Sequence, residues 1–407
     1  MSRLRNDFLW GAATAPHQTE GNNINSDWWA RELLAPGMEP SGDAVDSYHR
    51  YREDMRLLAD AGLNSYRFGI EWARIEPRPG MFSRAELAHY RRMIDTALEL
   101  GLTPVVTLHH FSSPRWFAEE GGWTNDRAVD RFVSYVETVT RILDGVEWVA
   151  TINEPNMLAM MTMLQDAMRS GDVAEWKSPT VDGEAERQRI AANLPVPEPK
   201  YGHRFVAVHH AVRDIVRERT GAKVGWTIAN QALTATPGNE DKLREVRYAA
   251  EDLYLEGSVG DDFVGVQSYS SQKVDANGVV PHPDHPDNTL TGAAYRPDAL
   301  GIAVRHAWES TGLPILVTEN GIATADDERR IQYTREALSH LIQAAQDGTD
   351  VRGYLHWSAL DNYEWGHWEP TFGLIAVDRE TFERRPKPSL GWLGAVARSG
   401  GASLTAG

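Results

Sequence analysis

Eight short apolar runs recur along the 407-residue chain, and their spacing is the feature that most restricts its fold. The runs are rich in β-branched residues, and amphipathic stretches with helical periodicity lie between them, such as 46–61, 84–100 and 201–219. Apolar strands that alternate with helices are typical of a parallel sheet covered by helices, because a helix is the usual crossover between parallel strands. The eight runs lie near residues 8–14, 64–72, 103–109, 147–153, 223–229, 262–269, 314–319 and 353–358.

The chain length fits one closed barrel with long loops. A (β/α)₈ barrel, or TIM barrel, typically needs about 250 residues, and the remainder can extend the loops that follow its strands. Two polar stretches, 165–200 and 270–297, are rich in Pro, Asp and Gly and follow the fourth and sixth strands. The alternative is disordered decoration, but the preceding strands carry candidate site residues, which favours a role in the rim. We predict a single barrel over residues 1–398 and a flexible tail over 399–407.

The composition excludes several classes of partner and chemistry. The formal net charge is −17, whereas nucleic acids and anionic membranes require clustered Lys and Arg. The chain has no cysteine, so disulfides, thiolate catalysis and cysteine-based metal sites are excluded.

The first residues contain no apolar segment before Phe8 that would indicate a signal peptide, and no apolar run is long enough to span a bilayer. A cytoplasmic location is the expectation.

Two carboxylate motifs follow two of the apolar runs. The first is Thr151–Pro155 (Thr-Ile-Asn-Glu-Pro) and the second is Val317–Gly321 (Val-Thr-Glu-Asn-Gly). Glu154 and Glu319 should each stand at the C-terminal end of a buried strand, since Pro155 or Gly321 stops the strand soon after. Either glutamate alone would be interpreted as a solvated residue at the end of a strand. Together, on one face of a barrel, they supply the two carboxyl groups that glycosidic bond cleavage requires.

These motifs closely resemble the acid/base and nucleophile motifs of glycoside hydrolase family 1, the β-glucosidase and β-galactosidase family. The resemblance covers nearly the whole chain, and its motifs occur in the family's order, which makes it far more specific than a lone Asn-Glu-Pro. The further motifs that resemble the family are Phe8–Ala15, Gln18–Gly21, Asn64–Trp72, Arg74–Pro77, Asp361–Trp365 and Phe372–Leu374.

The resemblance implies roles for four residues. Glu154 is the expected general acid/base, with a pKa raised by partial burial and by a neighbouring carboxylate. Glu319 is the expected nucleophile and must stay ionised. Arg67 matches a family position beside the nucleophile, where a guanidinium holds the carboxylate charged, although a structural ion pair would look the same. Tyr269 matches the family tyrosine that hydrogen-bonds the nucleophile, and the alternative is an ordinary buried tyrosine.

Other residues match the family's sugar-binding positions. Polar groups at the ring edge and aromatic faces beside it are what a sugar pocket needs. His109 and His110 are adjacent, so on a strand they point to opposite faces, and the motif selects His110. No carboxylate lies at ligand spacing from them, so a metal site there is not expected, and the glycosidase chemistry that the resemblance implies needs no cofactor or metal. The implied substrate-binding residues are Gln18, His110, Asn153, Trp357, Glu364, Trp365 and Phe372.

Glu364 indicates the state of the sugar's 6-position. A carboxylate accepts hydrogen bonds from sugar hydroxyls and repels a 6-phosphate, and family members that cleave 6-phospho-sugars carry a neutral residue there. Three features depart from the family: Phe111 replaces a tryptophan, Gln267-Ser268-Tyr269 replaces Asn-Tyr-Tyr, and the loop between Trp365 and Phe372 is shorter. These changes surround the sugar and aglycone subsites and leave the two glutamates in place.

We therefore predict a retaining exo-β-glycosidase that releases the terminal non-reducing β-linked sugar, a β-D-glucoside in the first instance, from small glycosides. In retaining enzymes the two carboxyl groups lie about 5–5.5 Å apart. A transglycosylase with the same residues and a non-catalytic carbohydrate-binding protein are the alternatives. The expected partner is a small glycoside or oligosaccharide, not nucleic acid or a membrane. The sequence leaves the preferred sugar, the aglycone and the oligomeric state open.

Overall fold

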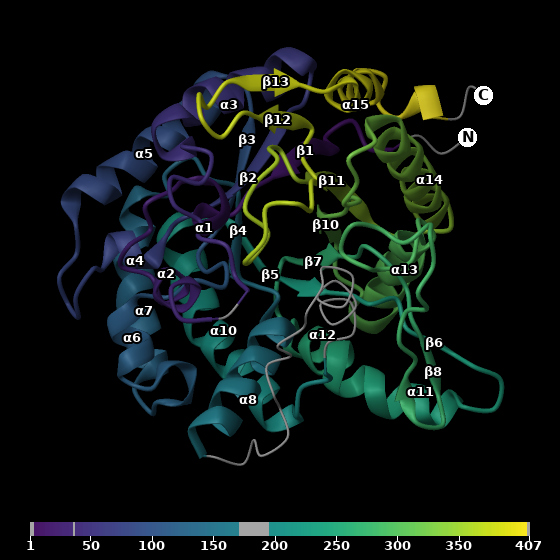
Figure 1. The fold of residues 1–407 in the computed structure, drawn as a ribbon, viewed down its shortest axis with the longest axis horizontal. Coiled ribbons are helices and arrows are strands. Elements are labelled where there is room, and N and C mark those ends of the chain that lie inside the picture. The colour runs from purple at the N-terminus through teal and green to yellow at the C-terminus, as the bar shows by residue number, and fades with distance from the viewer. Residues whose placement is uncertain (1–3, 36, 171–194, 405–407) are drawn as a thin grey trace.

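The computed structural model describes residues 4–35, 37–170 and 195–404. Its centre is a closed barrel of eight parallel strands in the order β1-β11-β10-β7-β5-β4-β3-β2, surrounded by helices (Figure 1). The predicted (β/α)₈ barrel is confirmed. The barrel strands are β1 (Leu9–Ala13), β2 (Ser65–Gly69), β3 (Thr103–Thr107), β4 (Trp148–Asn153), β5 (Lys223–Ala229), β7 (Phe263–Gln267), β10 (Ile315–Glu319) and β11 (Val351–Trp357).

Several helices of the outer layer begin or end at residues with clear capping roles. Ser83 caps α5 by accepting a hydrogen bond from the Glu86 N–H, and Asp326 caps α14 in the same way. Gly62 ends α3 with φ 101°, a left-handed conformation that favours glycine. The long helices are α3 (Ser47–Ala61), α5 (Arg84–Glu99), α7 (Ala128–Val139), α8 (Pro155–Ser170), α10 (Pro199–Thr220), α13 (Ala299–Thr311), α14 (Asp327–Gln346) and α15 (Pro388–Arg398).

Shorter elements extend the loops around the barrel. Two small sheets are separate from it, one of order β6-β8-β9 and one that pairs β12 with β13. The short strands are β6 (Thr234–Ala235), β8 (Lys273–Asp275), β9 (Gly278–Val279), β12 (Ile375–Val377) and β13 (Arg384–Pro386). The short helices are α1 (Pro16–Thr19), α2 (Asp27–Glu32), α4 (Trp72–Ile75), α6 (Arg115–Glu119), α11 (Glu240–Arg247) and α12 (Leu253–Gly257). Single turns cover Gly122–Thr124, Thr140–Ile142, Tyr248–Asp252 and Ala402–Leu404.

Apolar side chains fill the space between the strands and the helices in one large cluster. A second cluster joins strand residues to one another, among them Val105, Trp148, Phe263 and Leu316. Because the strands pack on two sides, they are almost continuously apolar, which explains why they stand out in the sequence.

Two barrel strands carry irregularities near their C-terminal ends. On β4 the register with β5 shifts between Ala150 and Asn153, and on β10 the register with β7 shifts between Val317 and Glu319. A bulge of this kind bends the strand and re-aims the side chains that follow it. Both bulges immediately precede the two glutamates that the sequence singles out.

The two polar stretches differ from the simple loops expected for them. Residues 165–170 continue helix α8, and helix α10 begins at Pro199, while 171–194 lie outside the described residues. The stretch 270–297 contains β8 and β9, followed by a loop that reaches back to the barrel. In the C-terminal stretch, Ala402–Leu404 form a helical turn and 405–407 are not described. Among the described helices, none is both long and apolar enough to cross a membrane.

Candidate active site

A cavity of about 840 Å³ opens at the C-terminal ends of the barrel strands. Its walls include most of the residues predicted from the sequence, namely His110, Glu154, Tyr269, Glu319, Trp357, Glu364, Trp365 and Phe372. The three remaining predicted residues, Gln18, Arg67 and Asn153, are fully buried: Gln18 donates to Glu364 and Arg67 to Glu319, both on the wall, and Asn153 accepts from Arg67. The fold thus gathers all the predicted positions around one pocket.

Glu319 is held from two sides. Arg67 donates from Nη1 to its Oε1 at 2.5 Å, and the Tyr269 hydroxyl donates to its Oε2 at 2.6 Å. The carboxylate is only 4% exposed, and the β10 bulge places it beside Gln267 of β7. Two donors that include a guanidinium favour the ionised form of a buried carboxyl group.

Glu154 lies on the cavity wall in a different environment. Its φ of 44° is in the left-handed region, which is uncommon for a residue with a side chain and clusters at functional sites. Its backbone N–H donates to the Thr227 carbonyl at 2.7 Å, and Pro155 starts helix α8 directly after it. None of the hydrogen bonds found among the described residues reaches its carboxyl group, which is partly exposed to the cavity.

The two carboxyl groups interact electrostatically, and their different surroundings separate their pKa values. Burial raises the pKa of Glu154 well above its usual value, and the charge of Glu319 raises it further. Burial also raises the pKa of Glu319, but the charge of Arg67 and the hydrogen bonds from Tyr269, Arg67 and Gln267 oppose that rise. Glu154 is therefore the carboxyl group that keeps its proton to higher pH.

Asn153 is fixed by three donors to the same oxygen. Its Oδ1 accepts from Arg67 Nη2 at 2.5 Å, from Gln267 Nε2 at 2.9 Å and from the Thr227 hydroxyl at 3.1 Å. Its Nδ2 is buried and has no partner within the described residues. Since buried polar groups are almost always paired, an amide donor held in this way indicates a ligand acceptor in the pocket.

A second polar group forms around Glu364. Trp357 Nε1 donates to its Oε1 at 3.2 Å and Gln18 Nε2 donates to its Oε2 at 3.1 Å. Gln18 also donates to the Asn362 side chain at 2.9 Å, while its own Oε1 is buried without a partner in the described structure. Burial raises the pKa of Glu364 to about 8, and the two donors oppose the rise.

Aromatic rings close the pocket beside these polar groups. His110 stacks on Trp357 with ring centroids 5.8 Å apart and on Trp365 at 6.0 Å. Phe111, which replaces the family tryptophan, meets Trp365 edge-on at 5.0 Å, and Phe372 meets Tyr269 edge-on at 5.8 Å. The substitution thus keeps the aromatic wall and removes one N–H donor.

His109 and His110 follow strand β3, and the side chain of His109 lies on the opposite side from that of its neighbour His110. The Nε2 of His109 lies 3.0 Å from the Ser113 hydroxyl, and its ring packs edge-on against Trp123 at 5.1 Å. Within the described residues, no group of three or more His, Asp or Glu side chains could hold a metal ion.

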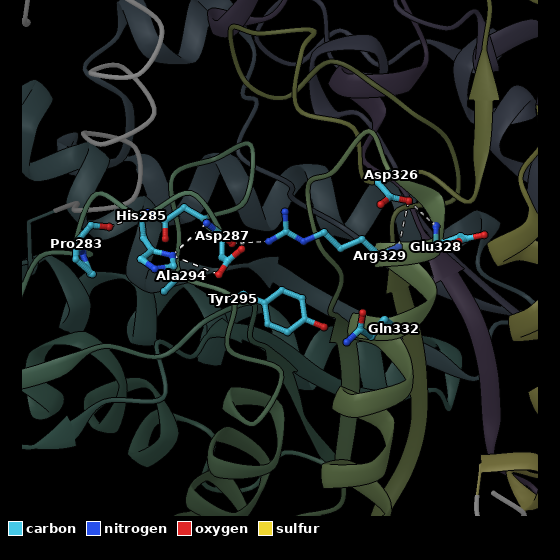
Figure 2. A pocket seen from close by; sticks show the side chains of 10 residues that line it. Pro283, His285, Asp287, Ala294, Tyr295, Asp326, Glu328, Arg329 and Gln332 are labelled. Atoms are coloured by element: carbon cyan, nitrogen blue, oxygen red, sulfur yellow. Dashed lines mark hydrogen bonds and ion pairs between the residues drawn. The ribbon is translucent and has the colours of Figure 1, made fainter.

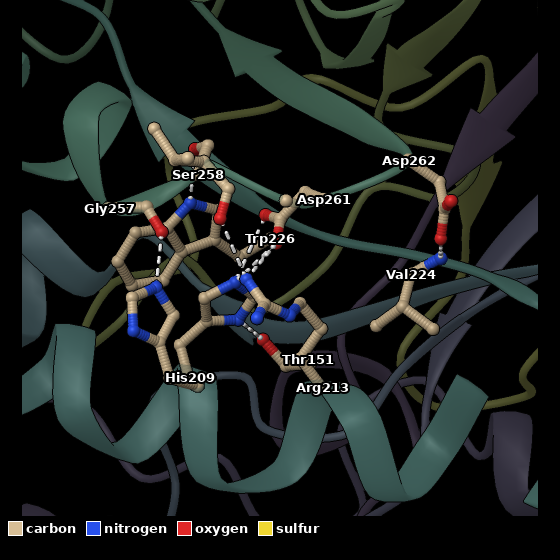
Figure 3. A network of polar contacts seen from close by, with 12 residues as sticks. Thr151, His209, Arg213, Val224, Trp226, Gly257, Ser258, Asp261 and Asp262 are labelled. Carbon is tan, nitrogen blue, oxygen red and sulfur yellow. Dashed lines mark hydrogen bonds and ion pairs between the residues drawn. The ribbon is translucent and has the colours of Figure 1, made fainter. Parts of the chain in front are cut away.

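A buried polar network supports the strand that carries Glu154 (Figure 3). The Thr151 hydroxyl of β4 lies 2.7 Å from His209 Nδ1, and His209 Nε2 lies 2.9 Å from Asp261. The His209 ring stacks on Trp226 at 4.3 Å, and Arg213 pairs with Asp261 at 3.3 Å. The network joins β4 to helix α10 beside the β4 bulge, and we infer that it helps to hold the backbone leading to Glu154.

Sequence reasoning missed an apolar part of the wall. Met157, Met160, Met161 and Leu164 of α8 line the cavity, and so do Leu290 and Ile322 on loops. The α8 residues follow Glu154 at helical spacing, which indicates a shared apolar face but not whether that face meets a core or a cavity. The Leu290 position has no comparable signal, because it depends on how the loop after β9 folds back.

A second cavity of about 790 Å³ is lined by other residues of that loop and by the start of α14 (Figure 2). Arg329 of α14 lies over the Tyr295 ring at 5.4 Å and also donates to the Asp287 carbonyl, as the extended side chain in Figure 2 shows. These contacts fasten the loop to α14. The same loop presents Leu290 to the first cavity, so its residues line both cavities.

A closed parallel barrel with two interacting carboxyl groups at its C-terminal face, among unpaired polar groups and aromatic rings, defines the class of barrel enzymes that cleave glycosidic bonds. The model of glycosyl hydrolase family 1 matches residues 1–250 and 254–402. The chain belongs to this family.

Individual relatives are similar to this chain over nearly its full length. The thermostable beta-glucosidase B of Thermobispora bispora is 30% identical, with 97% of this chain and 90% of that protein covered. The crystal structure of the beta-glycosidase BGL167 is 43% identical with a TM-score of 0.84 and 97% coverage of both chains. The family 1 beta-glucosidase of Thermotoga maritima is 25% identical, with a TM-score of 0.84 and coverage of 98% and 100%.

Proposed function

We propose that the protein is a retaining exo-β-glycosidase in which Glu319 is the nucleophile and Glu154 the general acid/base. The observation that carries this proposal is the unequal environment of the two carboxyl groups. Glu319 receives hydrogen bonds from Arg67 and Tyr269, which favour its charge, whereas burial and the charge of Glu319 favour the protonated form of Glu154. One ionised and one protonated carboxyl group form the pair that a retaining glycosidase needs.

The proposed reaction has two displacements. Glu319 attacks the anomeric carbon and forms an ester while the bond to the aglycone oxygen breaks, and Glu154 gives its proton to that oxygen. Water then attacks the anomeric carbon, Glu154 takes a proton from the water, and the bond to Glu319 breaks. The products are the free sugar, with its β-configuration retained, and the aglycone alcohol.

The proposed sugar is a terminal β-D-glucoside without a phosphate. The Nδ2 of Asn153 and the Oε1 of Gln18, which have no partner among the described residues, offer one donor and one acceptor for ring hydroxyls, and Glu364 offers acceptors beside Gln18. The names of the relatives, which are beta-glucosidases or beta-glycosidases, support the same choice.

A 2-deoxy-2-fluoro-β-D-glucoside with a good leaving group tests the mechanism. Fluorine destabilises the cationic transition states of both steps, and the leaving group compensates only in the first, so the ester should accumulate. Mass spectrometry of the intact protein should show one added fluoro-sugar, and the label should map to the peptide that contains Glu319. A label on another residue, or inverted product from the unmodified protein, would rule out this mechanism.

Discrimination against a 6-phosphate is expected to increase with pH. Because burial raises the pKa of Glu364 to about 8, the side chain gains its charge only as the pH passes that value. A phosphate monoester is already mostly dianionic above about pH 6, so between about pH 7 and 9 mainly the charge of the protein changes. The ratio of kcat/KM for 4-nitrophenyl β-D-glucoside to that for its 6-phosphate should rise about tenfold or more over this range.

The matched variant for this experiment is Glu364→Gln, which keeps the shape of the side chain and cannot ionise. Its ratio should be lower than that of the unmodified protein and should not depend on pH. A preference of the unmodified protein for the 6-phosphate, or the same pH dependence in Glu364→Gln, contradicts the assignment of this residue.

A further inference from the structure

We propose that the cavity wall formed by helix α8 is an aglycone subsite for apolar alcohols, of aryl, alkyl or terpenoid character, in preference to a second sugar. This inference rests on the proposed function and adds the class of leaving group. It is carried by Met157, Met160, Met161 and Leu164, which we call the methionine wall.

The spacing of these residues places them on one side of the helix. They stand at i, i+3, i+4 and i+7, and residues at such intervals share a helical face. A methionine stripe on a helix most often faces a core. Here Met160 is 4% exposed, but Met157, Met161 and Leu164 are only partly buried and all four line the cavity.

The position of the helix relates the methionine wall to the leaving group. Helix α8 begins at Pro155, so its first turns are covalently attached to Glu154. Glu154 is the proposed proton donor to the aglycone oxygen and must lie next to that oxygen. The atoms of the aglycone beyond the oxygen therefore extend along the side of the cavity that α8 lines.

The loop around Leu290 adds apolar surface to the same cavity. Leu290 donates its N–H to the Ala323 carbonyl at 3.0 Å, and the Ser270 hydroxyl donates to the Ala294 carbonyl at 2.8 Å, which hold the loop against the barrel. The Leu290 side chain packs against the cluster that contains Trp357 and Phe372. The aglycone subsite thus has apolar groups on the helix and on the loop.

Two polar residues of the cavity wall outside the methionine wall are engaged by tryptophans. Arg31 lies over the Trp28 ring at 4.8 Å, and Glu39 accepts a hydrogen bond from the Trp368 N–H at 2.9 Å. The methionine wall itself offers no hydrogen-bond donor and only the weak acceptors of thioethers. A second sugar against it would lose the hydrogen bonds that its hydroxyl groups make to water, and nothing would replace them. The apolar part of an aglycone makes no such hydrogen bonds and would lose none.

Methionine also predicts breadth within the apolar class. Its unbranched chain and polarizable sulfur adapt to differently shaped apolar groups and contact aromatic rings favourably. We therefore expect the subsite to accept alkyl and aryl aglycones with similar success.

The first test uses the unmodified protein and n-alkyl 1-thio-β-D-glucosides, from methyl to octyl, as competitive inhibitors. Each methylene buried against the methionine wall should lower the inhibition constant about two- to fourfold, the upper figure corresponding to about 0.8 kcal/mol. Thiocellobiose is the polar comparison and should bind more weakly than the octyl compound. An inhibition constant that does not change with chain length, or tighter binding of thiocellobiose, overturns the proposal.

The second test uses Met157→Gln and Met161→Gln, which keep the length of the side chain and make it polar. Each should lower kcat/KM for octyl β-D-glucoside about tenfold or more, relative to its effect on β-D-glucosyl fluoride, which has no aglycone. The kcat/KM for cellobiose should fall less than the kcat/KM for octyl β-D-glucoside. The matched control is Met168→Gln on the same helix, which is 52% exposed and is not a cavity residue, and it should change neither ratio.

The choice of substrates distinguishes failure of the proposed function from failure of the aglycone subsite. Failure to hydrolyse glucosyl fluoride would contradict the proposed function itself. The aglycone subsite alone would be overturned if both Gln variants hydrolysed glucosyl fluoride normally and kept or increased the ratio of kcat/KM for octyl β-D-glucoside to kcat/KM for glucosyl fluoride. Should a Gln variant fail to fold by circular dichroism, the inhibitor series on the unmodified protein still decides.

Discussion

Replacement of Glu319 by glycine is expected to lower kcat for 4-nitrophenyl β-D-glucoside on the order of 10⁵–10⁶-fold, the scale seen when a covalent nucleophile is removed. The expected loss is complete in practice, because no other carboxyl group accepts hydrogen bonds from both Arg67 and Tyr269 in the described structure. Initial rates with highly purified variant, and circular dichroism to show that the barrel is folded, provide the measurement.

Added azide or formate should restore part of the activity of Glu319→Gly. The vacated space keeps the guanidinium of Arg67 and the hydroxyl of Tyr269, which are suited to hold a small anion beside the anomeric carbon. With azide the product should be the α-glycosyl azide, because one displacement replaces two. Rescue that yields the β-product, or activity within about 100-fold of the unmodified protein, would show that Glu319 is not the nucleophile.

The barrel could be predicted from the sequence because its strands are buried on two sides. Runs such as 103–109 have no polar alternation, so each stands out against the amphipathic helices beside it. All eight predicted strands are found, with ends that differ by a few residues. The helix boundaries agree where local chemistry sets them, for instance where Ser83 caps α5.

Two structural features that aim the glutamates have no clear signal in the sequence. The bulges on β4 and β10 arise from the mutual register of strands that are distant along the chain. The left-handed φ of Glu154 is likewise imposed by its tertiary surroundings, since glutamate has no preference for it. A sequence pattern places Glu154 at the end of a strand, but it does not determine where the carboxyl group points.

The predicted site residues came from the resemblance to the family rather than from spacing. The structure places them around one cavity, and it also shows contacts that the motifs do not encode. Gln267, noted only as a departure from the family, donates to Asn153, and its hydrogen bond to Glu319 opposes the rise that burial causes in the pKa of that carboxyl group. The methionine wall escaped notice for a physical reason, because an apolar stripe on a helix looks the same whether it faces a core or a ligand.

Replacement of Glu154 by glutamine should produce losses that depend on the leaving group. An alkyl glucoside needs a proton on its departing oxygen, so its kcat/KM should fall about 10²–10⁴-fold, the usual contribution of general acid catalysis. The 2,4-dinitrophenyl glucoside needs no such help, and its kcat/KM should change little. Its kcat and KM should fall together, because water now attacks the ester without a base and the ester accumulates.

The pH profile gives the second signature of Glu154. In the unmodified protein kcat/KM for an alkyl glucoside should be bell-shaped. The acidic limb reports protonation of Glu319, and the basic limb reports loss of the Glu154 proton, whose pKa is raised by burial and by the charge of Glu319. Glutamine cannot lose that proton, so the basic limb should vanish while the acidic limb remains.

Glu147→Gln is a matched control for these measurements. Glu147 immediately precedes β4, at the end of the strand opposite the cavity, and its side chain is 68% exposed. Removing its charge should leave both limbs and the leaving-group dependence unchanged. If Glu154→Gln kept the basic limb and lowered kcat/KM equally for alkyl and dinitrophenyl glucosides, Glu154 would have to be a binding residue, and another group would have to supply the proton.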